Sequence, residues 1–365
     1  MHKDSNPTPA AHKVVVKPRA LNRSITVKDI AAEAGVSITT VSNVLLGKSD
    51  TYAPETGVKV KEVAQRMGYR RNNLARSLVR QKSMTLGILM EASFNFSHAE
   101  NQYFVGFLQG FLSEASRRGY QLKITVQDNH LSDDVIAMID DRSIDGLVAL
   151  VISPDNALMP WFDNARLPVV LVGCEARSPK ASSVDVDDYE CMSDLLDQVW
   201  QIGHRRYALL TGEQEHSSLA ERERAFAERI AQRRDPALTT QVFKTNMEGL
   251  SVDSVLREIA ALPASTRPTV LVCINDLIAV SVIRKAGDYG LRVPEDISVT
   301  GFDGFAVGDW CQPQLATIRQ PLARIGSKAA EILVESIDAK DAANIHHAVL
   351  PGRVLMRESV KVPTA

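Results

Sequence analysis

The sequence of 365 residues lacks several features that mark whole classes of protein. No apolar run approaches the roughly 18–20 residues that a membrane-spanning helix needs, so we expect no membrane partner. The first residues are polar and contain proline, lysine and histidine instead of an apolar core, which predicts no signal peptide and a cytoplasmic protein. The four cysteines, Cys174, Cys191, Cys273 and Cys311, have neither metal-binding spacing nor a disulfide-dense pattern, so we expect buried thiols.

The chemistry of an enzyme is also missing from the sequence. No nucleophile–base set and no cluster of metal ligands stands out. His204, in the segment IGHRR, is expected to be structural, and His346 and His347 lie in a polar stretch near the C-terminus. We therefore expect no catalytic residue, no metal and no cofactor, and only steady turnover of a bound sugar would revive an enzymatic function.

The net charge of −2 conceals an uneven distribution along the chain. Residues 1–82 contain 15 Lys and Arg against 6 Asp and Glu, a net charge of +9, whereas residues 83–365 contain 27 against 38, a net charge of −11. A basic head on an acidic body predicts a polyanionic partner for the head alone. Residues 1–24 are either a disordered basic tail that adds non-specific attraction to DNA or a tail without a role.

Residues 26–47, TVKDIAAEAGVSITTVSNVLLG, have the pattern of two short helices joined by a tight turn. Thr26 can cap the first helix, with Asp29 completing a weak capping box, and Ser37 can cap the second. Gly35 suits the turn because it can take a positive φ without a Cβ clash. The pattern predicts a helix-turn-helix whose second helix can enter a major groove, and the alternative is an ordinary helical hairpin.

Two further segments complete the amino-terminal part. A third helix is predicted from Pro54 to Met67, with an apolar face that closes a three-helix core. The segment Tyr69–Lys82, YRRNNLARSLVRQK, is strongly basic. It is either a conditionally helical hinge with a protruding leucine suited to minor-groove insertion, or a plain basic linker.

From Met84 onward, short apolar strands alternate with helical segments, which predicts parallel sheets covered by helices on both faces. So many units favour two doubly wound lobes over one sheet, and the fold class is α/β with a small all-α head. Ligands in such folds bind at the carboxyl ends of strands. The strand ends concerned are 91–96, 153–156, 173–175, 212–218, 275–276 and 303–305. The expected parts are a tail (1–24), a head (25–70), a hinge (71–83) and a two-lobed body (84–365).

The head, the linker and the body together resemble the lactose/galactose repressor family of bacterial transcription regulators. The resemblance extends from about Ile25 to Arg357. The motifs that carry the resemblance are TVKDIAAEAGVSITTVSNVL, NNLARSL, GLVALVISP, IGHRRYALLTG, NDLIAV and GLRVPEDISVTGFDG followed by LATIRQP. The resemblance implies a body like a periplasmic sugar-binding protein, with three strand crossovers between the lobes. It also implies a homodimer that binds a pseudo-palindromic operator in double-stranded DNA under allosteric control by a small effector, such as a sugar or sugar derivative.

The resemblance assigns base contacts to Ile38, Thr39 and Asn43. Asn43 stands where the family commonly has arginine, and because asparagine pairs with adenine whereas arginine pairs with guanine, we expect an altered half-site. The minor-groove leucine falls on Leu78, and Arg71 replaces a usual proline at the entry to the hinge. The other DNA-binding residues are Thr26 and the phosphate-contacting Ser37, Thr40 and Ser42.

The effector residues implied by the resemblance are Tyr103, Phe104, Ser153, Arg224, Asn275 and Asp303. Three positions depart from the family pattern. Ala227 replaces the glycine that usually follows the arginine, and Gly173 and Gly304 stand where the family often has aspartate. Asn275 and Asp276 can equally be the N-cap pair of a helix.

The leading hypothesis is an effector-controlled repressor, and the sign of the control, inducer or corepressor, stays open at this point. The alternative is a solute-binding protein for a small sugar without DNA regulation, which the missing signal peptide and the basic head oppose. The sequence does not specify the effector, the operator or the target genes. The absence of a heptad tail after Arg357 favours dimers over tetramers.

Overall fold

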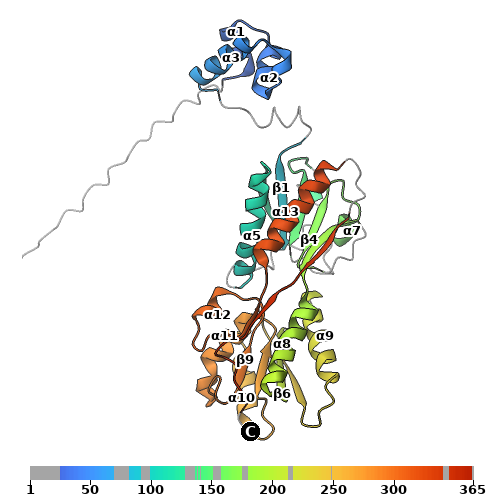
Figure 1. The fold of residues 1–365 in the computed structure, drawn as a ribbon, viewed down its shortest axis with the longest axis vertical. Helices are drawn as coiled ribbons and strands as arrows, with labels where there is room; N and C mark the ends of the chain where they lie inside the picture. Colours follow the sequence, from blue (N-terminus) through green and yellow to red (C-terminus); the bar gives the residue numbers. More distant parts are fainter. Residues whose placement is uncertain are drawn as a thin grey trace, which may run out of the picture. The chain divides into compact units, whose positions relative to one another are not determined.

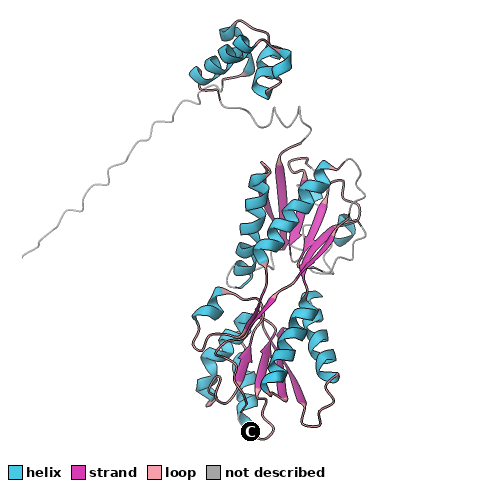
Figure 2. Cartoon of the chain, in the orientation of Figure 1, coloured by secondary structure: helices cyan, strands magenta, loops and turns pink. Residues whose placement is uncertain are grey.

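The computed structural model describes residues 25–69, 82–91, 99–127, 136–137, 139, 141–150, 158–174, 180–212, 217–247, 249–339 and 345–363. The chain divides into two compact units, Met1–Arg76 and Ser77–Ala365, and each is described by itself. Their boundary falls inside the predicted hinge. Figure 1 labels the elements, and Figure 2 shows that helices make up the first unit whereas helices and strands alternate in the second.

The first unit is a three-helix domain whose caps follow the local sequence. Its elements are α1 (Val27–Ala34), α2 (Ile38–Leu46), the 3-10 turn η1 (Ser49–Thr51) and α3 (Pro54–Arg66). The Thr26 N–H donates to Asp29 Oδ2 (2.8 Å), and the Asp29 N–H donates back to Thr26 Oγ1 (3.4 Å), which completes the predicted capping box. Gly35 takes φ +66° in the turn, and Ser37 Oγ accepts the Thr40 N–H (3.0 Å). The predicted helix-turn-helix is therefore present.

A small apolar core holds the three helices together. Ile30 and Ala34 of α1, Val41 of α2 and Val60 of α3 are fully buried. Gly57 allows α3 to approach the preceding turn, because a Cβ at this position would lie 2.7 Å from the Tyr52 ring. The glycine costs α3 about 1 kcal/mol in helix propensity but leaves room for that ring.

The first lobe of the second unit is a six-stranded parallel sheet in the order β11-β5-β4-β3-β1-β2. The strands are β1 (Thr85–Glu91), β2 (Gln121–Gln127), β3 (Gly146–Leu150), β4 (Val169–Val172), β5 (Ser182–Val186) and β11 (His347–Leu350). The helices of this lobe are α5 (Ala99–Arg117), α7 (Met159–Phe162) and α13 (Leu322–Asp338). The central strands β3 and β4 are buried along their whole length, as continuous apolar runs predict.

The second lobe is a four-stranded parallel sheet in the order β7-β6-β8-β9. The strands are β6 (Arg206–Gly212), β7 (Thr239–Thr245), β8 (Val270–Cys273) and β9 (Ser298–Thr300). The other elements are α8 (Asp188–Ile202), α9 (Ser217–Ala231), α10 (Val252–Ala261), α11 (Asp276–Lys285), η2 (Ala286–Tyr289) and α12 (Ala306–Trp310). The predicted architecture of two parallel-sheet lobes is confirmed.

The chain passes between the lobes three times, as the resemblance implied. It leaves the first lobe from β5 into α8, returns after β10 (Thr317–Arg319) into α13, and crosses again from β11 into β12 (Arg353–Leu355). Strands β10 and β12 pair antiparallel. Sequence reasoning did not predict β5, β7 or these short crossing segments, because none of them is a long apolar run.

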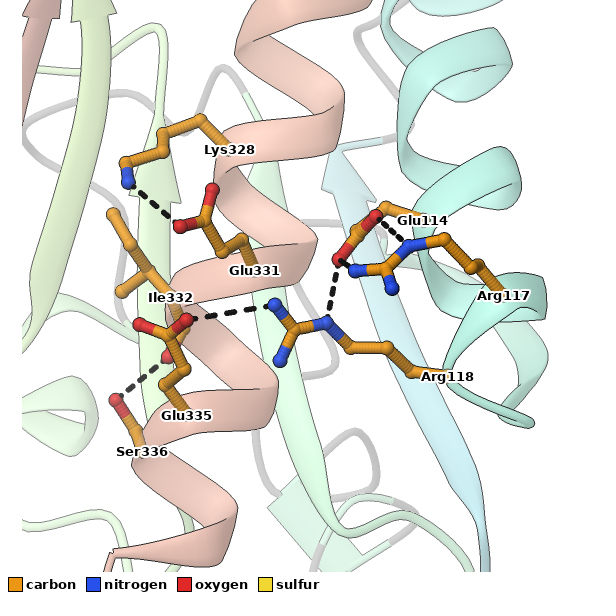
Figure 3. Close-up of polar contacts among 8 residues, drawn as sticks. All are labelled: Glu114, Arg117, Arg118, Lys328, Glu331, Ile332, Glu335 and Ser336. Carbon is orange, nitrogen blue, oxygen red and sulfur yellow. Dashed lines mark hydrogen bonds and ion pairs between the residues drawn. The ribbon is translucent and has the colours of Figure 1, made fainter.

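Helices α5 and α13 cross on the first lobe at a distance that only glycine permits (Figure 1). A Cβ at Gly110 would lie 1.7 Å from the Ala323 carbonyl oxygen, and one at Gly326 would lie 2.0 Å from the Phe107 carbonyl oxygen. Figure 3 shows the polar edge of this crossing, where Arg118 lies against Glu114 of its own helix and Glu335 of α13.

His204 is a structural residue, as expected from the sequence. Its ring is fully buried, with Nδ1 2.9 Å from Thr269 Oγ1 and Nε2 3.0 Å from the Lys361 carbonyl oxygen. Burial lowers the pKa of His204 from 6.5 to about 4, although the bond to the Lys361 carbonyl opposes this effect. The ring therefore stays neutral in the folded protein at pH values where an unfolded histidine is protonated.

We expect His204 to contribute to acid lability. Because the folded pKa is depressed, its contribution is complete above pH 6.5 and is lost as the pH falls towards 4, by roughly 3 kcal/mol. Urea unfolding of the wild type and of His204→Gln, followed at pH 7.5, 5.5 and 4.5, should give a difference in unfolding free energy that shrinks as the pH falls. A difference that does not change with pH would contradict this role.

Three of the four cysteines, Cys174, Cys191 and Cys273, are buried thiols that form no disulfide, and Cys311 is half-buried. Among the residues that the structure describes, no helix is both long and apolar enough to cross a membrane.

Candidate functional site

The second helix of the head presents a small, largely uncharged outer face. Ile38 is 49% exposed, although it is a large apolar residue, and Thr39 beside it is also exposed. Ser42 and Asn43 are half-buried on the following turn, and Val41 and Val44 anchor the opposite face in the core. Of the residues expected to contact bases, Ile38 and Thr39 are exposed at the amino-terminal end of α2, and Asn43 is half-buried about one turn further along.

The hydroxyl groups expected at phosphates are arranged around the caps. Ser37 Oγ and Thr40 Oγ1 lie 2.9 Å apart, and Thr26 Oγ1 donates to Asp29 Oδ2 (2.7 Å). Helix N-termini carry partial positive charge and free N–H groups, which suits phosphate contact. The predictions for Leu78 and Arg71 lie outside the described residues.

In the second unit, Arg222 of α9 is the centre of a buried polar cluster at the crossing from β5 into α8. Its Nε donates to Asp188 Oδ1 (2.6 Å), and its Nη1 donates to the Ile274 carbonyl (2.8 Å) at the end of β8. The same Nη1 lies 3.7 Å from Asp303 Oδ1, and the guanidinium stacks 3.5 Å from the centre of the Phe302 ring. The side chains of Arg222 and Asp188 are only 7% and 11% exposed.

Asp303 is held in an uncommon backbone conformation at the end of β9. Its φ is +128°, which is strained for any residue with a Cβ, and such strain collects at functional sites. Its Oδ1 accepts the amide N–H of Gln320 (2.8 Å). A Cβ at Gly304 would lie 2.5 Å from the Cα of Arg319, so the close approach of β10 explains why glycine stands there instead of aspartate.

Tyr103 of α5 is half-buried at the edge of the hydrophobic core and lies within electrostatic reach of Asp185, Asp188 and Arg222, whereas Phe104 is buried inside the core. Burial raises the pKa of Tyr103, and the nearby Asp185 and Asp188 raise it further while Arg222 lowers it. The two neighbours in sequence thus have different surroundings, because successive residues of a helix point about 100° apart.

Arg224, the arginine that the resemblance assigned to the effector, does not join the cluster. It is 49% exposed and pairs with Glu221 and Glu228 on its own helix, above the Tyr189 ring. The physical reason is the period of α9: Arg222 shares a face with the buried Leu219, Ala225 and Phe226, and Arg224 points away from it. The apolar residues at i−3, i+3 and i+4 from Arg222 are the signal that could have identified it.

Asn275 and Asp276 have structural roles at the start of α11, where Asn275 is the N-cap, in line with the alternative of a helix N-cap pair. Asn275 Oδ1 accepts the Ile278 N–H (2.8 Å) at the start of α11, and its Nδ2 donates to the Met247 carbonyl (2.9 Å). Asp276 is fully buried and accepts hydrogen bonds from the Phe305 N–H (2.7 Å) and the Thr317 hydroxyl. Ser153 lies outside the described residues.

Asp185, which sequence reasoning did not single out, belongs to the same region. It lies in β5, and its Oδ1 accepts the Gly173 N–H (2.7 Å) at the end of the neighbouring β4. Burial raises the pKa of Asp185 to about 7 against the lowering by the Gly173 N–H, and Asp188 raises it further. Burial likewise raises the pKa of Asp188 and Asp303, although Arg222 lowers both. Within the described part of the chain, no three His, Cys, Asp or Glu residues are grouped to hold a metal ion.

Comparison with known proteins gives a match for the helical unit and another for the two-lobed unit. Residues 26–72 match the profile of bacterial regulatory proteins of the lacI family, and residues 196–360 match that of a periplasmic binding protein-like domain. The chain is 31% identical over 319 residues to the HTH-type transcriptional repressor PurR of Aliivibrio fischeri (strain MJ11), covering 87% of this chain and 93% of that protein. It is 29% identical over 343 residues to PurR of Vibrio parahaemolyticus serotype O3:K6 (strain RIMD 2210633), covering 92% and 98%.

Two solved structures share the architecture. The Lac repressor dimer bound to operator and the anti-inducer ONPF superposes with a TM-score of 0.78 at 20% identity, covering 92% of this chain and 99% of that one. The complex of the transcriptional regulator CelR with cellobiose has a TM-score of 0.67 at 25% identity, covering 92% and 100%. The chain belongs to the lacI family of bacterial regulatory proteins, as a non-enzymatic, DNA-binding transcription regulator with a periplasmic-binding-protein-like effector domain.

Proposed function

We propose that the protein is a homodimeric repressor whose affinity for a pseudo-palindromic operator is controlled by a small molecule bound where the two lobes meet. The observation that carries this proposal is the buried cluster of Arg222, Asp188 and Asp303, which joins groups from three separate elements at the crossing between lobes. A ligand that contacts this cluster and Tyr103 touches both lobes, so its binding energy depends on how the lobes are arranged. Differential affinity for two arrangements is what allosteric control requires.

The proposed effector contacts are Tyr103, Arg222 and Asp303, with Asn275 close to the same strand ends and Ser153 retained from the sequence alone. Relatives support a small organic ligand without identifying it: CelR was solved with cellobiose, and a LacI family regulator from Enterococcus faecium was solved with ribose. The two departures at Gly173 and Gly304 do not remove acidic groups from the region, because Asp185 and Asp303 supply them.

On the DNA side, Ile38, Thr39 and Asn43 of α2 are proposed to read base edges. Ser37, Thr40 and Ser42 hold the helix on phosphates, and Leu78 is proposed, from the sequence, as the minor-groove wedge. Asn43 carries both an acceptor and a donor, the pair that matches the major-groove edge of adenine.

Selection of random duplex DNA by the full-length protein at near-physiological salt tests this assignment. We expect a two-fold symmetric site with adenine enriched at one position of each half-site. Asn43→Arg should shift that position to guanine, and Glu62→Gln on the exposed side of α3 should leave the site unchanged. Recovery of no motif, with binding that only weakens as salt rises, would mean that the head binds as a polycation.

An apolar strip on the first lobe supports the homodimer. Val105 and Leu112 lie two turns apart on α5 and are 57% and 48% exposed. Ile124 and Val126 of the edge strand β2 are 46% and 48% exposed. They lie on the same face of the sheet as Ile88, which belongs to the core that α5 also contributes to. Several large apolar residues exposed on one lobe are typical of an association surface.

We expect Ile124→Glu to give a monomer at micromolar concentration in sedimentation analysis, because the substitution would bury a charge in the subunit interface. Operator affinity should fall at least tenfold, since one head binds a half-site alone. Val242→Glu, on the edge strand of the other lobe and 59% exposed, is the matched control and should stay dimeric. A dimeric Ile124→Glu variant would place the interface elsewhere.

A further inference from the structure

The polar cluster between the lobes contains more carboxyl groups than cations. Arg222 is the cation that faces Asp188 and Asp303, at 2.6 Å and 3.7 Å, and its single charge is shared between them. Asp185 adds a third carboxyl group, close enough to Asp188 for that residue to raise its pKa, and Tyr103 lies within electrostatic reach of Asp185, Asp188 and Arg222. The ionised cluster is therefore negative.

Among the residues that the structure describes, two further arginines near the cluster, Arg319 and Arg357, are paired with another carboxylate and do not neutralise this excess. Arg319, the last residue of the crossing strand β10, lies next to Gly304, but its guanidinium pairs with Asp309 at 3.4 Å. Arg357 pairs with the same Asp309 carboxylate. These two arginines thus form a separate ion cluster with Asp309. Arg222 is the arginine that pairs with the buried carboxylates.

Asp185 has an unusual position for an acidic residue. It interrupts the buried pattern of β5, whose other four residues are all buried, and it lies one position beyond the pairing of Val172 with Val184. Its carboxyl group is held at the end of β4 by the Gly173 N–H (2.7 Å). A carboxylate from β5 thus stands beside the strand end at which the family often has aspartate.

We propose that Asp185 determines effector specificity: with Asp188 and Asp303, it selects a ligand that presents hydroxyl or amino hydrogens and excludes one that presents a phosphate or carboxylate group. This inference rests on the proposed function. Hydrogen bonds from neutral or cationic donors satisfy the carboxylates, whereas an anion at this place would face like charges in a partly desolvated site. Burial, with a further contribution from Asp188, raises the pKa of Asp185, which agrees with a carboxyl group that is short of hydrogen-bond donors and cations.

A purely structural role for Asp185 makes a different prediction. If the carboxyl group only accepts the Gly173 N–H, asparagine can take over through its side-chain oxygen, and ligand preference will not change. If the negative charge sets specificity, Asp185→Asn weakens the response to the native ligand and reduces the penalty for anions. The two roles are therefore distinguished by how Asp185→Asn changes the preference for ligands of different charge, and not by how it changes stability.

The test uses full-length protein and a water-soluble small-molecule extract of bacterial cells, divided by ion exchange into anionic, cationic and neutral fractions. Thermal unfolding and release of the selected operator are measured with each fraction, and with inorganic phosphate as a defined anion. We expect the wild type to respond to the neutral or cationic fraction and not to the anionic fraction or to phosphate. Asp185→Asn should need about tenfold more of the active fraction, the loss typical of one charged hydrogen bond. Glu331→Gln, which removes an exposed charge from α13, is the matched control and should match the wild type.

Each outcome decides between the two proposals. A wild-type response to the anionic fraction overturns the specificity inference and leaves effector control intact. An unchanged response of Asp185→Asn assigns Asp185 a structural role and also overturns the inference. If no fraction changes operator binding or unfolding, effector control itself fails, and the specificity inference fails with it.

Discussion

Replacement of Arg222 by methionine is expected to lower the free energy of unfolding of the effector-binding unit by about 3–5 kcal/mol, because it leaves buried carboxylates without their cation. Methionine keeps much of the length of arginine and the contact with the Phe302 ring. The loss of unfolding free energy is therefore caused mainly by removal of the positive charge. Without the arginine, the pKa values of Asp188 and Asp303 should rise further above their unfolded values. A raised folded pKa favours the native state at low pH, so the variant should recover stability as the pH falls from 8 to 5.

Urea unfolding of the wild type and variant at pH 8 and pH 5 measures both effects. Arg224→Met is the matched control, since this arginine lies two residues away on the same helix, is 49% exposed and contacts surface glutamates and the Tyr189 ring. It should change stability by less than about 1 kcal/mol. Asp188→Asn in the Arg222→Met background should restore part of the loss. Equal effects of the two arginine substitutions would remove the basis for a buried cluster centred on Arg222.

Gly110→Ala is expected to destabilise the first lobe by about 3 kcal/mol or more, because the added methyl group collides with backbone and not with a movable side chain. Its Cβ would lie 1.7 Å from the Ala323 carbonyl oxygen, so α5 and α13 must separate. Separation would loosen the apolar contacts of Phe107 and Phe111, which are fully buried between these helices and the sheet.

Thermal and urea unfolding of Gly110→Ala test this packing. Gly287→Ala is a suitable control, since a Cβ at that exposed position meets nothing within 4 Å and its backbone has no positive φ. The control should change stability by no more than about 0.5 kcal/mol. If Gly110→Ala unfolds like the wild type, the two helices do not pack at the distance described here.

Arg222 and Arg224 show how little in the local sequence separates a buried arginine from an exposed one. Both arginines lie in the segment ERERAFA, and only the position of the neighbouring apolar residues distinguishes them. The buried face of α9 contains Leu219, Arg222, Ala225 and Phe226, so the helical period would have selected Arg222. Asp185 was missed for another reason: nothing in a β-strand pattern says which neighbouring strand its side chain will meet.

Several strands were also beyond local pattern recognition. Strand β7 is at the edge of its sheet and is mostly exposed or half-buried, so it lacks the apolar run that identified β6 and β8. Strands β10 and β12 have three residues each and are defined by pairing with each other over a long sequence separation. Such elements exist only once the lobes have formed, because their hydrogen bonds are not local.

The sequence by itself determined the helix-turn-helix, the alternation of strands and helices and the two-lobed body. The signals for these features are local: caps at Thr26 and Ser37, a turn glycine at Gly35, and apolar periods of helix or strand. Only the tertiary structure decided that Arg222 and not Arg224 joins Asp188 and Asp303, and that Asp185 lies beside Gly173. These groups come from α8, α9, β5 and the segments that follow β4 and β9, and their proximity follows from packing and chain crossings that no local pattern encodes.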